Sequence, residues 1–266
     1  MNDATISKKV TVKDDKIPLR AVLERPGRGR CPVMIVLHGF TSNKDKQHTL
    51  AACAAMREAG FATLRFDLYG HGESGGEFKK HTLLKWLSNT LAVMEYARGL
   101  DFVTELWLSG HSQGGLVAAL AGGMCPDLVR GLVLRAPAFL IPEAARAGIL
   151  LGRRFDPLRI PDEFPVSDEL TLEAGYIRTA QLLHVEDALD RFPGPVLLLH
   201  GDADEVLPPE DSLRAARRYS NCRLELLPGE SHHFDRCRAQ MSALIRDWLK
   251  AETAAPVCGP ESAPTP

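Results

Sequence analysis

The chain has 266 residues, 45% of them hydrophobic and 25% charged, and its formal net charge is -2. This length and composition are typical of a globular protein with one large core. A charge so close to balance gives no electrostatic reason to expect a nucleic acid or an anionic membrane as a partner. The opening sequence MNDATISKKV lacks the apolar stretch of a signal peptide, and no apolar run approaches the ~20 residues of a transmembrane helix, so we expect a cytoplasmic protein.

The six cysteines form no C-x-x-C pair, and their spacings do not suggest a zinc ribbon. A disulfide framework is not expected in a chain this long with so few cysteines. We therefore expect reduced thiols, most of them small core residues. They are Cys31, Cys53, Cys125, Cys222, Cys237 and Cys258.

Short apolar runs alternate with segments of helical spacing. The chain opens with two strand-like runs that predict a hairpin, and PVMIVLHG has the composition of a strand buried on both faces. The alternation that follows predicts an α/β fold with a mostly parallel central sheet and helices on both faces. In chain order we expect strands at 8–14, 18–25 and 32–39, a helix within 44–59, a strand at 61–67, a helix at 83–98, a strand at 106–110, a helix at 113–124, strands at 129–137 and 195–201, a helix near 210–219, a strand at 222–227 and a helix at 234–250.

The alternation breaks between residues 138 and 192, where several prolines accompany helical patches around 142–152 and 168–183. Because this segment lies between two predicted sheet strands, we expect an inserted cap over the carboxyl end of the sheet, where open α/β folds bind ligands. The core of the α/β fold would then comprise residues 1–137 and 193–250. The tail at 251–266 is rich in Pro, Ala, Ser and Thr and predicts a disordered end.

The candidate nucleophile is Ser112, in the G-x-S-x-G motif at 110–114. The serine of this motif occupies a sharp strand-to-helix turn, and the small residues around it let neighbouring backbone pass closely. The context fits, because LWLS precedes the motif as a strand and Gln113 begins a helix whose N–H groups point at the reacting carbonyl.

A serine hydroxyl needs a base within hydrogen-bond reach, and the base needs an orienting acid. His232 and His233 both lie in LPGESHHF, between the last strand and the last helix, and we favour His232. His233 is expected to flank the pocket. We expect no metal site, because adjacent histidines on a loop with no third ligand nearby do not make one. His200 is expected to be structural, and His184 falls in the cap.

The orienting acid should follow the strand at 195–201. Asp204 lies past the turn and can reach back toward the histidine loop, so we favour it strongly. Asp202 is expected to form the turn itself, by bonding its own backbone, and Glu205 is expected to be solvated.

Two backbone N–H groups should stabilise the oxyanion of the tetrahedral intermediate, and losing one such donor typically costs about 3 kcal/mol. One is the amide of Gln113, directly after the nucleophile. The other is assigned to Phe40, in the loop after the strand at 32–39. Arg65 and Asp67, in the next Gly-rich loop, are expected to brace that loop, which has no phosphate-binding motif.

Five segments together resemble α/β-hydrolase esterases, and among these most of all the bacterial cinnamoyl (feruloyl) esterases. The segments are HGF at 38–40, RFDLYGHGES at 65–74, GHSQGG at 110–115, HGDADEVLP at 200–208 and GESHHF at 229–234, and the resemblance covers about residues 15–250. It implies the triad Ser112, Asp204 and His232, the oxyanion amides of Phe40 and Gln113, an aromatic acyl group under the cap, and no metal or organic cofactor.

The expected activity is hydrolysis of small carboxylic esters through an acyl-enzyme, with feruloyl-type esters among the candidates. Phe155, Phe164 and Tyr176 are candidates to line the acyl pocket, and packing within the cap is an equal alternative for each. The apolar segment at 139–152 also admits plain aliphatic or aryl esters. Thioesterase, amidase and acyltransferase activities use the same machinery, and a ligand-binding receptor on this scaffold is the alternative from another class. The partner is a small-molecule ester, and a homodimer is left open.

Overall fold

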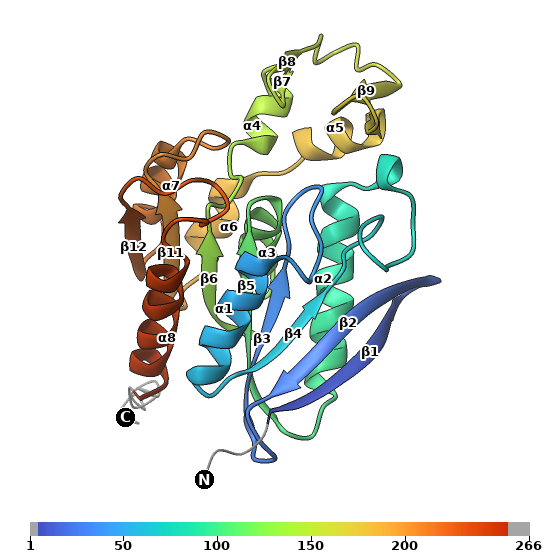
Figure 1. Cartoon of the computed structure of the whole chain (residues 1–266). Helices are drawn as coiled ribbons and strands as arrows, with labels where there is room; N and C mark the ends of the chain where they lie inside the picture. The colour runs from blue at the N-terminus through green and yellow to red at the C-terminus, as the bar shows by residue number, and fades with distance from the viewer. Residues whose placement is uncertain (1–4, 255–266) are drawn as a thin grey trace, which may run out of the picture.

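A twisted eight-stranded sheet forms the centre of the protein in the computed structural model, which describes residues 5–254 (Figure 1). The strand order is β1-β2-β4-β3-β5-β6-β11-β12. The first two strands form the expected antiparallel hairpin, β2 is antiparallel to β4, and all other neighbours are parallel. The predicted fold class is therefore confirmed. The strands are β1 (Ile6–Asp14), β2 (Ile17–Arg25), β3 (Cys31–Leu37), β4 (Ala62–Phe66), β5 (Val103–His111), β6 (Val129–Arg135), β11 (Val196–Gly201) and β12 (Cys222–Leu227).

Helices cover both faces of the sheet because its central strands are apolar on both sides. On β3, Met34 and Val36 pack into the cluster that includes α1 (Gln47–Glu58) and α8 (Arg238–Ala254). The alternate residues Ile35 and Leu37 pack into the larger cluster with α2 (Leu83–Arg98) and α3 (Gln113–Met124). Helix α7 (Pro209–Ala216) contacts β11 and β12 at the edge of the sheet. This alternation fixes each strand's register, because a slip by one residue would exchange the two faces.

The C-terminal helix begins and ends four residues later than expected, at Arg238 and Ala254. Helix α8 continues to Ala254, so the predicted disordered tail would begin within it, and the remainder of that tail, 255–266, lies outside the described residues. Of the cysteines, Cys258 also lies outside them. The other five are free thiols, and only Cys53 is fully buried. Within residues 5–254, no helix combines the length and apolarity needed to cross a membrane.

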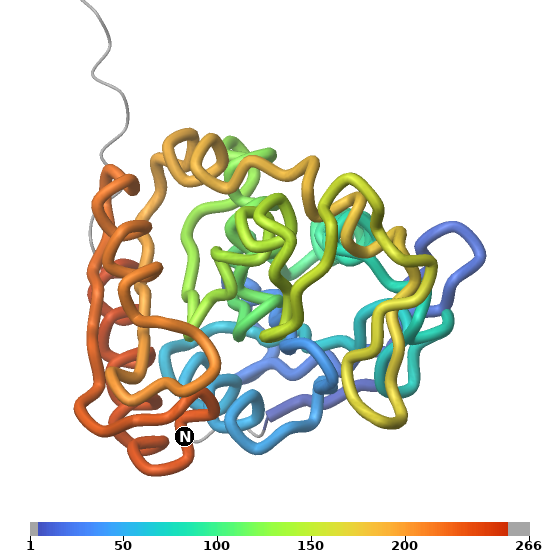
Figure 2. The backbone as a smooth tube through the Cα atoms, turned by 90° about the horizontal axis from the view of Figure 1, so that it is seen from above, coloured from blue at the N-terminus to red at the C-terminus, as the bar shows by residue number. Residues whose placement is uncertain are grey.

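The insertion between β6 and β11 lies over the carboxyl ends of the strands (Figures 1 and 2). Seen from above, its yellow-green chain crosses over the middle of the molecule (Figure 2). It contains helix α4 (Ile141–Arg146), the small hairpins β7 (Ile149–Leu150) with β8 (Arg153–Arg154) and β9 (Glu163–Pro165) with β10 (Thr171–Glu173), and helices α5 (Ala174–Gln181) and α6 (Val185–Arg191).

Helix α6 belongs to the core layer rather than to the cap. It packs against α3 beside the sheet, where Gly123 lets it approach: a Cβ at that glycine would lie 2.3 Å from the Ala188 carbonyl oxygen. We therefore place the end of the cap before α6, earlier than the expected boundary at residue 192.

The Gly-rich loop after β4 is braced by Asp67, whose side chain is fully buried. Its carboxylate accepts hydrogen bonds from the Lys44 amide and ammonium, both at 2.8 Å, and from the Glu73 amide at 2.9 Å. Arg65 does not pair with Asp67, because its guanidinium bonds Glu24 at 2.6 Å instead. The loop that follows β3, which carries Phe40, is thereby tied to the loop that follows β4.

Candidate active site

Ser112 occupies a strained turn between β5 and α3. Its φ is 54° and its ψ is -125°, a conformation that non-glycine residues seldom adopt. Close backbone contacts around the turn hold it there. A Cβ at Gly110 would lie 2.2 Å from the Gly114 oxygen, and a Cβ at Gly114 would lie 2.2 Å from the His38 oxygen. The turn brings Ser112 to the wall of a cavity beneath the cap.

His232 and Asp204 form a direct pair beside this cavity. His232 Nδ1 lies 2.7 Å from Asp204 Oδ2, and His232 lines the same cavity as Ser112. The other carboxylate oxygen accepts hydrogen bonds from the backbone amides of Val206 at 2.8 Å and Leu207 at 2.9 Å. Because Asp204 holds Nδ1, the ring nitrogen left to exchange protons is Nε2.

The environment of Asp204 favours its charged form. Burial alone would raise the pKa of this carboxyl, but hydrogen bonds from His200, His232 and the Leu207 amide outweigh that effect and hold the pKa well below its usual range. A carboxylate that stays ionised can orient His232 and stabilise the imidazolium that forms when the base takes a proton.

His200 contributes to the site, although it was expected only to be structural. Its ring is fully buried, and Nε2 lies 3.1 Å from Asp204 Oδ2 and 3.2 Å from the Leu207 carbonyl oxygen. Both neighbours are acceptors, so we place the ring hydrogen on Nε2, and Nδ1 then accepts from the Ser212 hydroxyl at 2.6 Å. The position of His200 at the end of β11, four residues before Asp204, was the available signal.

The loop at 228–237, called here the His232 loop, is held by Glu230 and Asp202. Glu230 is buried, and its carboxylate accepts from the backbone amides of Ser231, Arg236 and Cys237. Asp202 accepts from the Gly229 amide at 2.6 Å, so its bond is to this loop rather than to its own turn. Glu205 is exposed. Sequence reasoning missed Glu230, whose role depends on the fold of the loop.

The two candidate oxyanion donors are available. Among residues 5–254, neither the Phe40 amide nor the Gln113 amide donates a hydrogen bond. Gln113 is the first residue of α3, where the N–H group has no partner within the helix. A Cβ at Gly39 would lie 3.1 Å from Ser112 Cβ, so this glycine lets the Phe40 backbone approach the serine. The cavity-lining residues include all three of the loop residues Gly39, Phe40 and Thr41.

The cavity measures about 340 Å³, and its cap side is aliphatic. Of the three aromatic residues expected to line it, only Tyr176 does so. The rings of Phe155 and Phe164 instead pack edge to face at 5.6 Å, in the interior of the cap. Phe155 and Phe164 therefore pack within the cap and do not line the acyl pocket. The aliphatic lining consists of Ala138, Leu140, Ile141, Ala144, Ile149, Leu150, Leu151, Val206 and Leu207.

Tyr176 links the cap to the candidate oxyanion hole. Its hydroxyl donates to Gln113 Oε1 at 2.7 Å, and its ring lies 6.4 Å from that of Phe40. Burial raises the pKa of the Tyr176 phenol, so the hydroxyl remains a donor. The contact joins α5 of the cap to the first residue of α3.

Buried histidines lie behind Phe40. His81 packs on the rings of Phe40 at 5.4 Å and Tyr176 at 5.1 Å, and His38 packs edge to face on Trp86 at 5.3 Å. Burial, assisted by the nearby His71, lowers the pKa of His38 and of His81 to about 3. These rings are therefore neutral near pH 7, and they support the Phe40 loop without adding charge to it.

Comparison with known proteins identifies relatives of this chain. A family model described as serine aminopeptidase S33 (Hydrolase_4) matches residues 30–163. The structure of Est1E from Butyrivibrio proteoclasticus with ferulic acid bound is 43% identical, with a TM-score of 0.91 over 92% of this chain and 100% of that chain. Human mitochondrial palmitoyl-protein thioesterase ABHD10 is 25% identical over 228 residues, which are 82% of this chain and 72% of that protein.

Proposed function

The chain belongs to the Hydrolase_4 family of α/β-hydrolases and is a serine hydrolase, and we propose that it cleaves small carboxylic esters with Ser112, His232 and Asp204. The observation that carries this proposal is the meeting of three features in one cavity. They are a serine on a strained turn, a histidine held by a buried carboxylate, and two backbone amides beside the serine that have no hydrogen-bond partner among residues 5–254.

The chemistry follows from these positions. Ser112 Oγ attacks the ester carbonyl carbon while His232 Nε2 takes its proton. The Phe40 and Gln113 amides donate to the developing oxyanion. The intermediate then collapses, the alcohol leaves with the proton from His232, and an acyl-enzyme remains. Water attacks this acyl group with His232 again as the base, which releases the acid and restores Ser112.

The acyl group of the substrate is proposed to lie against the aliphatic cap wall. The 43% identity to Est1E, whose structure contains ferulic acid, supports a hydroxycinnamoyl group. The wall itself supports aliphatic acyl groups equally, because Ile141, Ala144 and Ile149 offer no hydrogen bond to a ring hydroxyl. Esters of both types therefore belong in the test.

Thioesterase activity is the second candidate. The relative ABHD10 is described as a palmitoyl-protein thioesterase, and an aliphatic cavity wall suits an alkyl acyl chain. The same acyl-enzyme would form, with a thiol leaving in place of an alcohol. Comparing the acetyl and octanoyl esters with their thioesters separates the two, because the acyl part is constant and only the leaving group changes.

Aminopeptidase activity, suggested by the description of the family, has less support. An aminopeptidase must hold the positive α-amino group of its substrate, for which a carboxylate is the usual partner. No Asp or Glu of residues 5–254 lines the cavity. A carboxylic ester or thioester makes no such demand.

The test is turnover of p-nitrophenyl acetate, p-nitrophenyl octanoate and methyl ferulate by wild type and by Ser112→Ala. We expect multiple turnovers by wild type and a loss of at least about 10⁴-fold in kcat for the variant. Ser42→Ala, a change of another hydroxyl that lines the same cavity, is the matched control and should keep most activity. Equal activity of wild type and Ser112→Ala would exclude Ser112 as the nucleophile. Tight ligand binding without turnover would favour the receptor alternative.

A further inference from the structure

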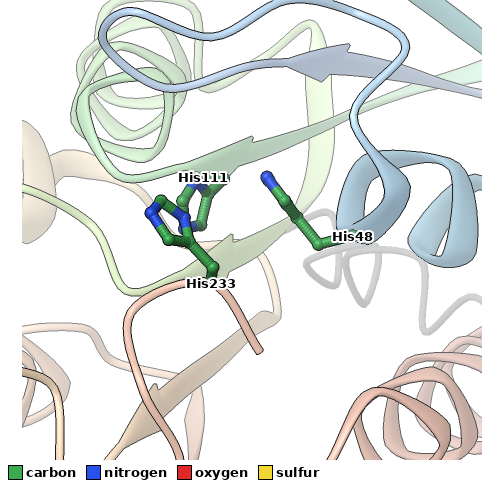
Figure 3. Close-up of side chains that lie close together, drawn as sticks. All are labelled: His48, His111 and His233. Carbon is green, nitrogen blue, oxygen red and sulfur yellow. The ribbon is translucent and has the colours of Figure 1, made fainter. Parts of the chain in front are cut away.

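Three histidines outside the proposed triad converge beside the His232 loop (Figure 3). His48 comes from the first turn of α1, His111 from the end of β5, and His233 from the loop itself. Each offers one ring nitrogen, and these nitrogens all lie within 4.8 Å of one another. The ring centroids are 4.4 Å apart for His48 and His111, 5.9 Å for His48 and His233, and 5.8 Å for His111 and His233.

We propose that His48, His111 and His233 form a binding site for a late transition-metal dication, with Zn²⁺ as the test ion. Three imidazoles with an open fourth position are a common ligand set for such ions. The sequence alone predicts no metal site here, because it shows only two adjacent histidines on the loop and no third ligand near them. The fold supplies the missing ligands from positions 48 and 111.

His111 is oriented as a metal-ligating histidine would be. Its Nε2 lies 2.9 Å from the His232 carbonyl oxygen, so we place the hydrogen on Nε2 and the lone pair on Nδ1. Metal-ligating histidines commonly donate their other N–H to a carbonyl in this way, which fixes the ring. Nδ1 is buried and has no hydrogen-bond partner among residues 5–254, and the residue is only 2% exposed. A bound ion would give this lone pair a partner.

His48 and His233 complete the site, His48 from its buried side and His233 from its exposed side. His48 is buried, and its Nδ1 accepts a weak hydrogen bond from Arg135 Nη1 at 3.4 Å, so Nε2 carries the ring hydrogen in the free protein. To bind an ion through Nε2, the ring must move this hydrogen to Nδ1 and give up the contact with Arg135. His233 is exposed, and no hydrogen bond from the described chain holds its ring. Rotation of this side chain can therefore bring its nitrogen to the Zn–N distance of about 2.0–2.1 Å. Because His111 and His233 line the catalytic cavity, the fourth position faces space open to water.

The Arg135 guanidinium opposes binding through its charge. It also donates to the His48 carbonyl oxygen at 3.2 Å, a bond that it can keep when the His48 ring binds an ion. Its repulsion is equal for all dications, so the strength of the bond to imidazole decides which of them bind. We expect Zn²⁺, Ni²⁺ and Cu²⁺ to bind and the oxygen-preferring Mg²⁺ and Ca²⁺ not to bind.

Metal binding is also expected to inhibit ester hydrolysis, a consequence that depends on the proposed function. His233 adjoins His232, and an ion on it would place positive charge near the base. That charge disfavours the imidazolium that His232 forms when it takes the Ser112 proton. Binding itself is independent of the reaction, so a direct binding assay tests the site even if the substrate proposal fails.

The experiment is Zn²⁺ titration calorimetry on the full chain without an affinity tag, after chelator treatment. The proteins are wild type, His48→Gln, His233→Gln and the matched control His184→Gln, whose histidine is exposed in the insertion. We expect one Zn²⁺ per chain for wild type and the control, and affinities at least about tenfold weaker for the other two variants. Circular dichroism checks folding, and His233→Gln, at an exposed position, covers the case in which His48→Gln fails to fold.

A second readout is the visible spectrum of bound Co²⁺. Wild type should give the intense bands of a four-coordinate ion, and His233→Gln should lose them. The proposal is overturned if wild type binds no Zn²⁺, or if His48→Gln and His233→Gln bind it as tightly as wild type. A further variant, His232→Gln, is titrated in the same way. The proposal is also overturned if binding is lost only in this variant, because the ion would then lie on the triad.

Discussion

His200 and His232 approach the same oxygen of Asp204. Asp204 Oδ2 lies 3.1 Å from His200 Nε2 and 2.7 Å from His232 Nδ1. The carboxylate is therefore held on this side by a buried ring that does not line the cavity, while the backbone amides of Val206 and Leu207 hold its other oxygen. We therefore expect His200 to act on the reaction only through Asp204, as a positioning residue.

Removal of the His200 donor should lower kcat and leave KM unchanged. In His200→Leu, Asp204 loses one of the contacts that fix its orientation, and a base displaced by about 1 Å can cost up to about 100-fold in rate. Steady-state kinetics on p-nitrophenyl acetate measures both parameters. His200→Gln retains an N–H donor and should recover much of kcat. A purely structural role would instead lower thermal stability in both variants without this recovery.

The turn around Ser112 should not tolerate a side chain at Gly114. In Gly114→Ala, the new Cβ would lie 2.2 Å from the His38 oxygen. Helix α3 would therefore have to move away from the backbone that follows β3. We expect a loss of about 3 kcal/mol in the free energy of unfolding, measured by urea denaturation. Gly29→Ala is the matched control, because a Cβ there meets nothing within 4 Å. Equal stability of the two variants would contradict the tight packing of this turn.

A large residue at position 144 should shorten the acyl pocket. Ala144 lines the cavity from α4, so the larger side chain in Ala144→Phe should fill part of the cavity beside the aliphatic wall. We expect kcat/KM for p-nitrophenyl octanoate to fall at least about tenfold, with little change for the acetate. The control is Ala147→Phe, which adds the same ring at an exposed position three residues away. If both esters lose activity equally in Ala144→Phe, the acyl chain does not lie along this wall.

The protein should lose stability as the pH falls below about 6.5, the pKa that an unfolded histidine has. His38 and His81 have folded pKa values of about 3, so between these two limits the unfolded chain binds the protons that the folded chain does not. Each group then lowers the free energy of unfolding by about 1.4 kcal/mol per pH unit as pH decreases. Urea midpoints across this range measure the slope.

His81→Phe isolates one of these groups. A phenyl ring suits the aromatic surroundings of His81, and its loss of a titratable nitrogen should reduce the pH slope by about one proton. His184→Gln, at an exposed histidine, should leave the slope unchanged. A slope in His81→Phe equal to that of wild type would show that this ring is not kept neutral by burial.

The core of the fold was predictable because its signals are local. Apolar runs such as 32–39 identify buried strands, and helices 83–98 and 113–124 were placed at their observed bounds. The order of Ser112, Asp204 and His232 along the chain likewise reflects their places at the ends of three strands. The structure brings Asp204 and His232 into contact and puts Ser112 and His232 in one cavity.

The cap and the supporting residues were less predictable because they depend on tertiary contacts. Hairpins whose strands have only two or three residues, such as β7 with β8, are too short to show a periodic sequence pattern. Phe155 and Phe164 had equal claims on the pocket and the cap interior, and only packing decided between them. His200 contacts Asp204 only because the turn after β11 brings the two side chains together. His48, His111 and His233 come from three separate segments of the chain, which only the fold brings together.

The hydrogen bond from Tyr176 to the Gln113 side chain also bears on protein engineering. A cap can be exchanged between related proteins in order to transfer the substrate specificity of one protein to the core of another. Here the donor of that bond belongs to the exchangeable segment and its acceptor to the scaffold, next to the nucleophile. A chimera whose cap lacks the tyrosine would leave the buried side-chain oxygen of Gln113 without this hydrogen-bond donor. Position 113 should therefore be redesigned together with the cap.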